Sequence, residues 1–315
     1  MRAVQIKDIT PAEEVRLVEV DKPCVRPGWV LVKVKAFGLN HSEQILRLSE
    51  IKASYIQKPV IPGIECVGEI EDASDTDFKK GQKVVALMGG MGRSFDGGYA
   101  EYALLPAHHV FAVCSDLSWD RLAAVPETYF TAWGSLFECL QLKPEDTLLV
   151  RGATCALGYV VIQIAKAYGC KVIATTHREN KFDLIKDADE VVLDTGILKG
   201  KVHGVNKALD LVGPKVLRDT LLCVEKGAIV CNTGILGGDF GLNNFAPISD
   251  IPNGVYLTGF HSNFPTKKDI DDIFAFINEH KLTPPIGECF KFDDITNALI
   301  AQDHGKVNGK IVIQI

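Results

Sequence analysis

The spacing of hydrophobic residues changes along the chain and divides it into two parts. Up to about residue 110 the apolar residues come in short runs, and Val30, Val32 and Val34 alternate with residues that include Lys33 and Lys35. This alternation predicts a strand with one buried face. Pro62-Gly63 and Gly97-Gly98 mark turns between later segments. The first part of the chain is therefore expected to form a mostly antiparallel, barrel-like domain.

From about residue 118 the period becomes helical, and strands then alternate with helices. The predicted strands are 147–151, 171–176, 190–193, 206–212, 227–232 and 254–259, and the predicted helices are 157–168, about 180–186 and 214–224. This alternation is typical of a doubly wound parallel sheet of Rossmann type. A helix over 269–279 and a strand over 310–315 are expected to return to the first domain.

The junction at residues 147–158 carries the clearest functional signal, because an apolar strand enters a turn of small residues and then a long helix. Gly152 allows a sharp reversal, and Gly158 allows the helix to pack closely on the sheet. The free N–H groups of the first helical turn favour anionic oxygens. Small residues also occur where a helix merely packs near a strand, but here the rest of the unit follows. The expected phosphate-binding residues are Gly152, Ala153, Thr154, Cys155, Ala156, Leu157 and Gly158.

Composition narrows the class of protein. With 315 residues, 47% of them hydrophobic, the chain can build two cores. The net charge of −6 and the scattered basic residues argue against a nucleic-acid partner. The charged N-terminal residues and the lack of any apolar run of about 18 residues predict a cytoplasmic protein without a membrane partner. The nine cysteines include no CxxC pair and are expected to be reduced.

Seven segments together resemble the medium-chain dehydrogenase/reductase superfamily, and within it the zinc-independent quinone oxidoreductase-like branch. The segments are Ala36-Phe37-Gly38-Leu39-Asn40, Ile61-Pro62-Gly63-Ile64-Glu65, Gly97-Gly98-Tyr99-Ala100-Glu101-Tyr102, Thr131-Ala132-Trp133, Gly152–Gly158, Leu209-Asp210-Leu211-Val212-Gly213 and Gly309-Lys310-Ile311-Val312. The resemblance implies an α/β fold: a GroES-like, mostly-β catalytic domain over 1–115, completed by about 262–315, and a Rossmann NADP-binding domain over 116–261. It also implies a homodimer.

Two positions bear on a catalytic metal. In the zinc alcohol dehydrogenases of this superfamily, a cysteine ligand would stand where this chain has Asn40, and a histidine ligand where it has Ile64. A neutral amide and an alkyl group cannot replace thiolate and imidazole as zinc ligands. His41 and Glu65 remain as possible ligands, but a pair is too few. The chain is therefore expected to hold no metal.

The choice between NAD and NADP is expected to depend on the residues after the second strand of the nucleotide unit. NAD-specific sites place an acidic residue there to bind the ribose 2′-hydroxyl. This chain has hydroxyls and basic groups instead, which favours the 2′-phosphate of NADP(H). The alternative is that the cations only solvate a helix start, and Glu179 is a complication. The expected 2′-phosphate residues are Thr175, Thr176, His177, Arg178 and Lys181.

Without a metal, catalysis would need hydrogen-bond donors for the developing oxyanion of the acceptor. The resemblance implies this role for Asn40, and for Tyr55 unless Tyr55 is an ordinary loop tyrosine. It places further cofactor contacts at Thr128, Thr233, Gly234, Ile235 and Phe260. The implied activity is NADPH-dependent hydride transfer to a small-molecule acceptor, a quinone or an α,β-unsaturated carbonyl (enone). The alternative is a non-catalytic NADPH-binding protein of crystallin or sensor type.

Cys155 stands where the family usually has glycine. It is interpreted first as a small residue that the turn tolerates. The second interpretation is a reactive thiol, because a thiol at a helix N-terminus has its pKa lowered.

Overall fold

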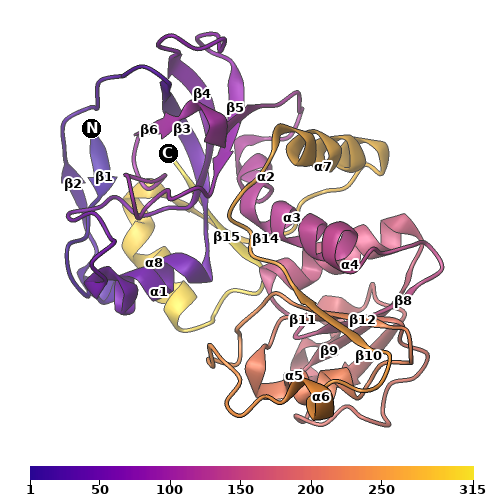
Figure 1. Ribbon diagram of the computed structural model, residues 1–315. Coiled ribbons are helices and arrows are strands. Elements are labelled where there is room, and N and C mark those ends of the chain that lie inside the picture. The colour runs from indigo at the N-terminus through magenta and orange to yellow at the C-terminus, as the bar shows by residue number, and fades with distance from the viewer. The chain divides into compact units, whose positions relative to one another are not determined.

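The computed structural model describes residues 1–315 and divides into two compact units (Figure 1). The first unit comprises residues 1–130 and 262–315, and the second comprises residues 131–261. Residues 116–130 thus belong to the first unit, whereas the sequence placed them in the nucleotide domain. The reason is that α2 (Trp119–Ala123) packs on β3 (Trp29–Leu39), β4 (Glu65–Asp72) and β15 (Lys310–Gln314).

The first unit is built on a seven-stranded sheet with the order β14-β15-β3-β4-β5-β7, in which β6 also pairs with β3. All pairings are antiparallel except that of β14 with β15. Val30, Val32 and Val34 of β3 are buried while Lys33 is exposed, as the alternation predicts. The remaining strands of this sheet are β5 (Lys83–Leu87), β6 (Tyr102–Pro106), β7 (Val110–Ala112) and β14 (Ile286–Lys291), and β1 (Arg2–Val4) pairs with β2 (Leu17–Glu19) in a separate two-stranded sheet.

Short helices complete the first unit. Its α-helices are α1 (His41–Leu48), α2, α7 (Lys267–Glu279) and α8 (Ile295–Asp303), and α3 (Pro126–Trp133) crosses the boundary between the units. The single-turn helices are η1 (Ala12–Glu14), η2 (Glu50–Lys52), η3 (Ala107–His109) and η6 (Phe292–Asp294). None of the helices of the protein is both long and apolar enough to cross a membrane.

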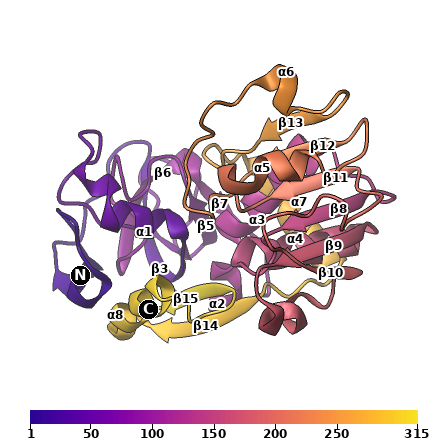
Figure 2. The same ribbon diagram turned by 90° about the horizontal axis from the view of Figure 1, so that it is seen from below.

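The second unit contains a six-stranded, wholly parallel sheet with the order β10-β9-β8-β11-β12-β13, whose strands lie side by side in Figure 2. Two sets of three strands run outward from β8 and β11, so the predicted doubly wound sheet is confirmed. The strands are β8 (Thr147–Arg151), β9 (Lys171–Thr176), β10 (Glu190–Leu193), β11 (Lys207–Asp210), β12 (Ile229–Asn232) and β13 (Tyr256–Gly259).

The helices of the second unit are α4 (Ala156–Tyr168), α5 (Pro214–Leu221), α6 (Pro247–Asp250), the π-helix η4 (Gly134–Cys139) and the 3-10 helix η5 (Glu179–Ile185). Several predicted elements differ in type or in bounds; the helix expected over 214–224, for example, ends at Leu221. The helix expected at about 180–186 is the 3-10 helix η5, and the strand expected over 206–212 ends at Asp210. It ends there because the Asp210 carboxylate accepts hydrogen bonds from the N–H groups of Val212 and Gly213, which turns the chain.

Candidate cofactor and active-site residues

The turn between β8 and α4 is held by backbone geometry. Gly152 has φ of +82°, a conformation that side chains other than glycine rarely adopt. The N–H of Ala153 donates to the carbonyl of Thr175 at 2.9 Å, which ties the turn to the end of β9. At Gly158 a Cβ atom would collide with the Ala153 carbonyl. The small residues are therefore required by the close approach of α4 to the turn.

Cys155 is the N-cap of α4, and its Sγ accepts a hydrogen bond from the N–H of Gly158 at 3.3 Å. Burial raises the pKa of the Cys155 thiol, and the N–H groups of Gly158 and Leu157 lower it only in part. The expectation of a thiol with a lowered pKa is therefore wrong, because desolvation outweighs the helix N-terminus. The structure supports the other interpretation, in which a small side chain fits the turn.

Arg151, the last residue of β8, is fully buried and was not among the predicted site residues. Its guanidinium donates to Asp194 at 2.8 Å and to Asp219 at 2.8 Å. Asp194 follows β10 and Asp219 lies on α5, so the three residues join separate elements just before the turn. The available signal was an arginine that ends an otherwise apolar strand.

Two threonines at the end of β9 are buried and shape the turn. Thr175 Oγ1 accepts from the N–H of Gly152 at 3.2 Å, and Thr176 Oγ1 lies 3.2 Å from Thr154 Oγ1. Thr175 was expected to present a donor to a 2′-phosphate, but its side chain has no solvent-exposed surface. Its position explains the geometry of the turn rather than recognition of the phosphate.

Three basic residues follow Thr176 and form a cluster, which we call the 177–181 cluster: His177, Arg178 and Lys181. Arg178 Nε donates to His177 Nε2 at 3.0 Å, and neither Arg178 nor Lys181 forms an ion pair with a carboxylate. Burial and the positive charge of Arg178 lower the pKa of Lys181. The cluster therefore carries positive charge that the protein does not compensate.

The other predicted cofactor residues of the second unit lie after neighbouring strands. Thr233 follows β12, and its Oγ1 lies 2.9 Å from the hydroxyl oxygen of Ser135 on η4. Gly234 and Ile235 come next, and Phe260 follows β13 with its ring against Gly134. Because all strands of this sheet are parallel, these residues and the β8–α4 turn share its carboxyl edge. Thr128 lies buried on α3 in the first unit.

Asn40, in the first unit, is half-buried and forms, with the buried Glu43, Glu65 and Lys310, a polar group that we call the Asn40 cluster. The Asn40 Oδ1 atom accepts a hydrogen bond from Lys310 Nζ at 2.5 Å, and Asn40 Nδ2 donates to Glu65 Oε1 at 2.9 Å. A second, longer bond of 3.4 Å runs from Nδ2 to Glu43 Oε1. The amide predicted to hold the acceptor oxygen is thus bound on each side by protein groups.

Two carboxyl groups and one ammonium occupy this cluster. Lys310 Nζ lies 2.5 Å from Glu65 Oε1, and their side chains are 3% and 0% exposed. Burial, aided by the charge of Glu65, raises the pKa of Glu43 to about 7. Glu43 also accepts N–H bonds from Ile64 and Asn40, both at 2.9 Å, and caps α1. In the sequence, Lys310 stands out only as part of a motif, and Glu43 was not among the predicted site residues.

These side chains do not fit a zinc ion. The Asn40 oxygen is engaged by the Lys310 ammonium, Ile64 offers a buried alkyl group, and His41 is exposed and bound to Gln44 at 2.7 Å. No three His, Cys, Asp or Glu side chains converge anywhere in residues 1–315. A divalent cation beside Asn40 would also meet the positive charge of Lys310.

Tyr55 is 64% exposed and lies after η2. Its hydroxyl donates to Glu50 Oε1 at 2.8 Å, and Glu50 also binds Arg93 at 2.8 Å. This ion-pair network accounts for the position of Tyr55 without a catalytic role, and no hydrogen bond joins Tyr55 to the Asn40 cluster.

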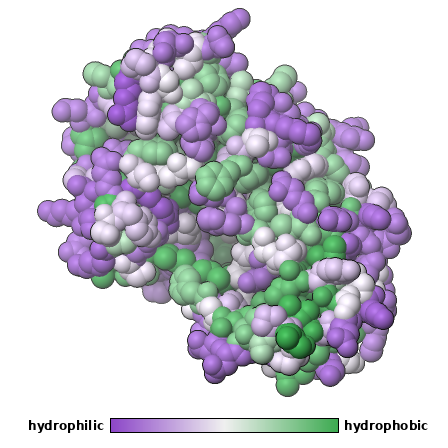
Figure 3. Space-filling model, in the orientation of Figure 1, coloured by the Kyte–Doolittle hydropathy of each residue, from purple (hydrophilic) through white to green (hydrophobic).

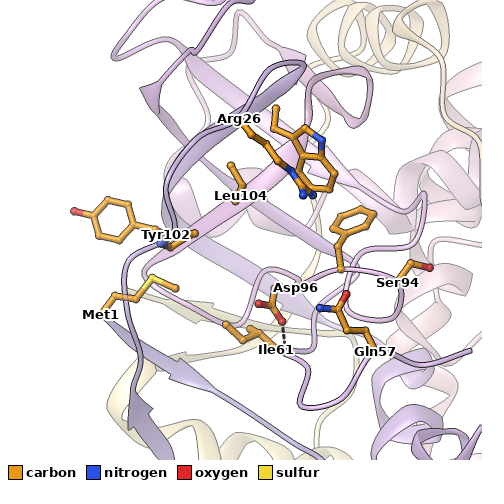
Figure 4. A pocket seen from close by; sticks show the side chains of 11 residues that line it. Met1, Arg26, Gln57, Ile61, Ser94, Asp96, Tyr102 and Leu104 are labelled. Carbon is orange, nitrogen blue, oxygen red and sulfur yellow. Dashed lines mark hydrogen bonds between the residues drawn. The ribbon is translucent and has the colours of Figure 1, made fainter. Parts of the chain in front are cut away.

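The first unit also contains a cavity of about 370 Å³ (Figure 4). Arg26 lies over the ring of Trp29 at 3.8 Å, and the rings of Trp29 and Phe95 meet edge to face. The Asp96 carboxylate accepts the N–H of Ile61 at 2.8 Å. None of the predicted site residues lines this cavity.

Comparisons with known proteins agree on the type of chain. Residues 26–115 match the family model of the alcohol dehydrogenase GroES-like domain, and residues 186–313 match that of the zinc-binding dehydrogenase. The quinone oxidoreductase of Lama guanicoe is 32% identical over 99% of this chain and 97% of its own length. The human quinone oxidoreductase is 32% identical, and the match covers 68% of this chain and 64% of the human protein.

Solved structures show the same fold over the full chain. A crystal structure described as an NAD-dependent alcohol dehydrogenase has a TM-score of 0.88, with 26% identity and complete coverage of both chains. A mycobacterial protein solved as its NADPH complex has a TM-score of 0.86 and 23% identity, again with complete coverage of both.

Proposed function

The chain belongs to the medium-chain dehydrogenase/reductase superfamily, whose members are oxidoreductases, and we propose that it is a zinc-independent reductase that uses NADPH. Its acceptor is a quinone or an α,β-unsaturated carbonyl compound. The observation that carries the proposal is the 177–181 cluster, which places uncompensated positive charge beside the β8–α4 turn. NAD-selective sites place an acidic residue on the ribose 2′-hydroxyl, whereas Glu179, the acidic residue of this segment, is exposed and follows Arg178.

The residues of the second unit fit this cofactor. The Gly152 turn and the N-terminus of α4 offer backbone N–H groups to the pyrophosphate. Arg178 and Lys181 provide donors for the 2′-phosphate, and Thr233 and Phe260 lie at the same sheet edge for the nicotinamide end. NADPH supplies a hydride when it is bound. The chain itself must bind and orient the cofactor and hold the acceptor.

On the acceptor side, we propose Asn40 as the donor that stabilises negative charge on the acceptor oxygen. Its hydrogen bond to Glu43 is long, at 3.4 Å, so this N–H is the one that can turn to a substrate at least cost. Asn40→Ala should lower turnover by about 10²–10³ while NADPH affinity stays unchanged. An NADPH affinity that falls with turnover would instead assign Asn40 to folding of the unit.

Cofactor titration tests the proposal directly. NADPH and NADH are titrated by fluorescence with the wild type, Arg178→Ala and Lys181→Ala. We expect tighter binding of NADPH, and each substitution should remove about 1.5–3 kcal/mol from NADPH binding only. Equal affinity for both cofactors would contradict the NADPH assignment. A panel of quinones and enones, with NADPH oxidation as the readout, then identifies the acceptor class.

A non-catalytic NADPH-binding role is the second candidate. It is favoured by one observation: the amide of Asn40 and the hydroxyl of Tyr55 both have protein partners. NADPH binding without oxidation by any acceptor of the panel would support this role and contradict the reductase.

We propose that the chain forms a homodimer through the second unit. Strand β13 is an edge strand, and Tyr256 on it is exposed. Hydrophobic residues gather on the surface near α5 and α6 (Figure 3), where Ile248 is 98% exposed. An unpaired edge strand is a template for pairing with a second copy. Light scattering of the wild type and of Tyr256→Lys, which should be monomeric, tests this.

A further inference from the structure

We propose that His177 is a third ligand of the 2′-phosphate that acts only when it is protonated, so that the preference for NADPH over NADH increases as pH falls. The inference rests on the proposed NADPH site. It concerns how that site is regulated by protons, and it adds a specificity-determining residue to Arg178 and Lys181.

The hydrogen bond with Arg178 defines the state of the free His177 ring. Arg178 Nε is an obligatory donor, so His177 Nε2, 3.0 Å away, must accept and cannot carry a hydrogen. The ring is therefore neutral, with its proton on Nδ1. Burial and the positive charges of Arg178 and Lys181 lower the pKa of His177, which agrees with this geometry.

The charged groups that face His177 come from two segments. Arg178 and Lys181 belong to the start of η5, and Asp194 follows β10. Asp194 acts in the opposite direction and raises the pKa of His177, but its carboxylate is bound to the Arg151 guanidinium at 2.8 and 3.0 Å. Positive charge therefore dominates around the ring as long as no anion is bound.

A bound 2′-phosphate reverses this balance. A phosphate monoester carries about −1.5 to −2 charges near neutral pH and accepts several hydrogen bonds. Arg178 Nε can then turn to the phosphate, which releases His177 Nε2, and the anion stabilises the imidazolium form. His177 takes up a proton on binding and becomes a charged donor. NADH lacks the phosphate and gains nothing from this step.

Calorimetry measures this linkage without catalysis. NADPH and NADH are titrated at pH 6, 7 and 8, each in two buffers of different ionisation enthalpy, so that proton uptake is counted. Three proteins are compared: the wild type, His177→Gln and His203→Gln. In His177→Gln the amide oxygen still accepts a hydrogen bond from Arg178. His203→Gln is the matched control, because His203 is an exposed histidine of the same unit. Because the phosphate has its own pKa near 6, only differences between variants are interpreted.

We expect His177→Gln to weaken NADPH binding by about tenfold at pH 6, because a shift of one unit in the pKa of His177 on binding is a factor of ten in affinity. At pH 8 the substitution should weaken NADPH binding by less than about twofold. The variant should also take up fewer protons than the wild type when NADPH binds. NADH binding should be equal in all three proteins. An NADPH preference with the same pH profile in the wild type and His177→Gln would overturn the inference and leave the proposed function intact. Equal affinity for NADPH and NADH at every pH would overturn both.

Discussion

The β8–α4 turn of the second unit and the Asn40 cluster of the first are built in opposite ways. In the turn, Gly152 and Gly158 fix the geometry through backbone contacts within the turn and with Thr175 at the end of β9. In the Asn40 cluster, charged side chains from β3–α1, β4 and β15 meet in the core. The turn depends mainly on the close backbone packing that small residues allow, whereas the Asn40 cluster depends on contacts between charged and polar side chains.

This difference predicts which kind of substitution destabilises each region. A turn that needs small residues fails when a Cβ atom is added, at a moderate cost in packing. A buried ion pair fails when one partner is removed, because the other charge is left without compensation in a medium where it cannot be hydrated. We therefore expect the largest effects in the Asn40 cluster and smaller ones in the turn.

Lys310→Met should have the largest effect on stability. The substitution keeps the length of the side chain and leaves the carboxylate of Glu65, which is 0% exposed, without its ammonium partner. We expect a loss of about 3–5 kcal/mol in the free energy of unfolding, measured by urea denaturation.

The double variant Lys310→Met/Glu65→Gln is the control for this prediction. It removes both charges, so it should regain at least half of the lost stability. A single substitution that costs less than about 1 kcal/mol would show that the Asn40 cluster does not depend on this ion pair.

Glu43→Gln should change how stability depends on pH. The pKa of Glu43 is raised from 4.5 to about 7 in the folded protein, so its protonated form favours folding. The contribution of Glu43 to the free energy of unfolding is therefore fully present below pH 4.5 and is lost as pH rises through 7, by roughly 3 kcal/mol in total. The variant should lack this loss. Urea denaturation between pH 5 and pH 8.5 measures this, with Glu13→Gln at an exposed position as the control. The prediction is contradicted if the unfolding free energy of both variants depends on pH as in the wild type.

Much of the fold could be predicted from the sequence, because its elements follow local rules. The strand over 147–151 and the strand over 171–176 have the predicted bounds, since apolar runs beside glycine and small-residue turns define them. The 3-10 helix at 179–185 and the early end of β11 at Asp210 could not be predicted. β11 ends early because the Asp210 carboxylate accepts hydrogen bonds from the N–H groups of Val212 and Gly213, a side-chain choice that the hydrophobic pattern does not reveal.

The candidate site residues also differ in how far they could be predicted from the sequence. Gly152 and Gly158 were visible because the conformation they permit is a property of the residue itself. The partnership of Asn40 with Lys310 joins residues 270 positions apart and leaves no local signal. Thr175 was misassigned because the sequence shows a hydroxyl but not the burial of that hydroxyl.

Gly158→Ala tests the turn itself. The added Cβ would collide with the Ala153 carbonyl, so α4 must shift away from the turn. We expect a loss of about 1–3 kcal/mol in stability and weaker binding of both NADPH and NADH. Gly241→Ala is the matched control, because nothing lies within 4 Å of a Cβ built there. Equal behaviour of the two alanine variants would mean that close packing at Gly158 is not required.

The smallest effect is expected at Cys155, where the turn needs a small N-cap rather than a thiol. Cys155→Ser keeps an acceptor for the N–H of Gly158, so NADPH affinity and stability should stay near the wild-type values. Cys155→Ala removes the cap and should cost about 1 kcal/mol. Because burial raises the pKa of the Cys155 thiol, alkylation of Cys155 at pH 7 should be slower than that of the exposed Cys24. Peptide mapping after alkylation measures the extent of labelling at each cysteine. Preferential labelling of Cys155 would support the reactive-thiol interpretation instead.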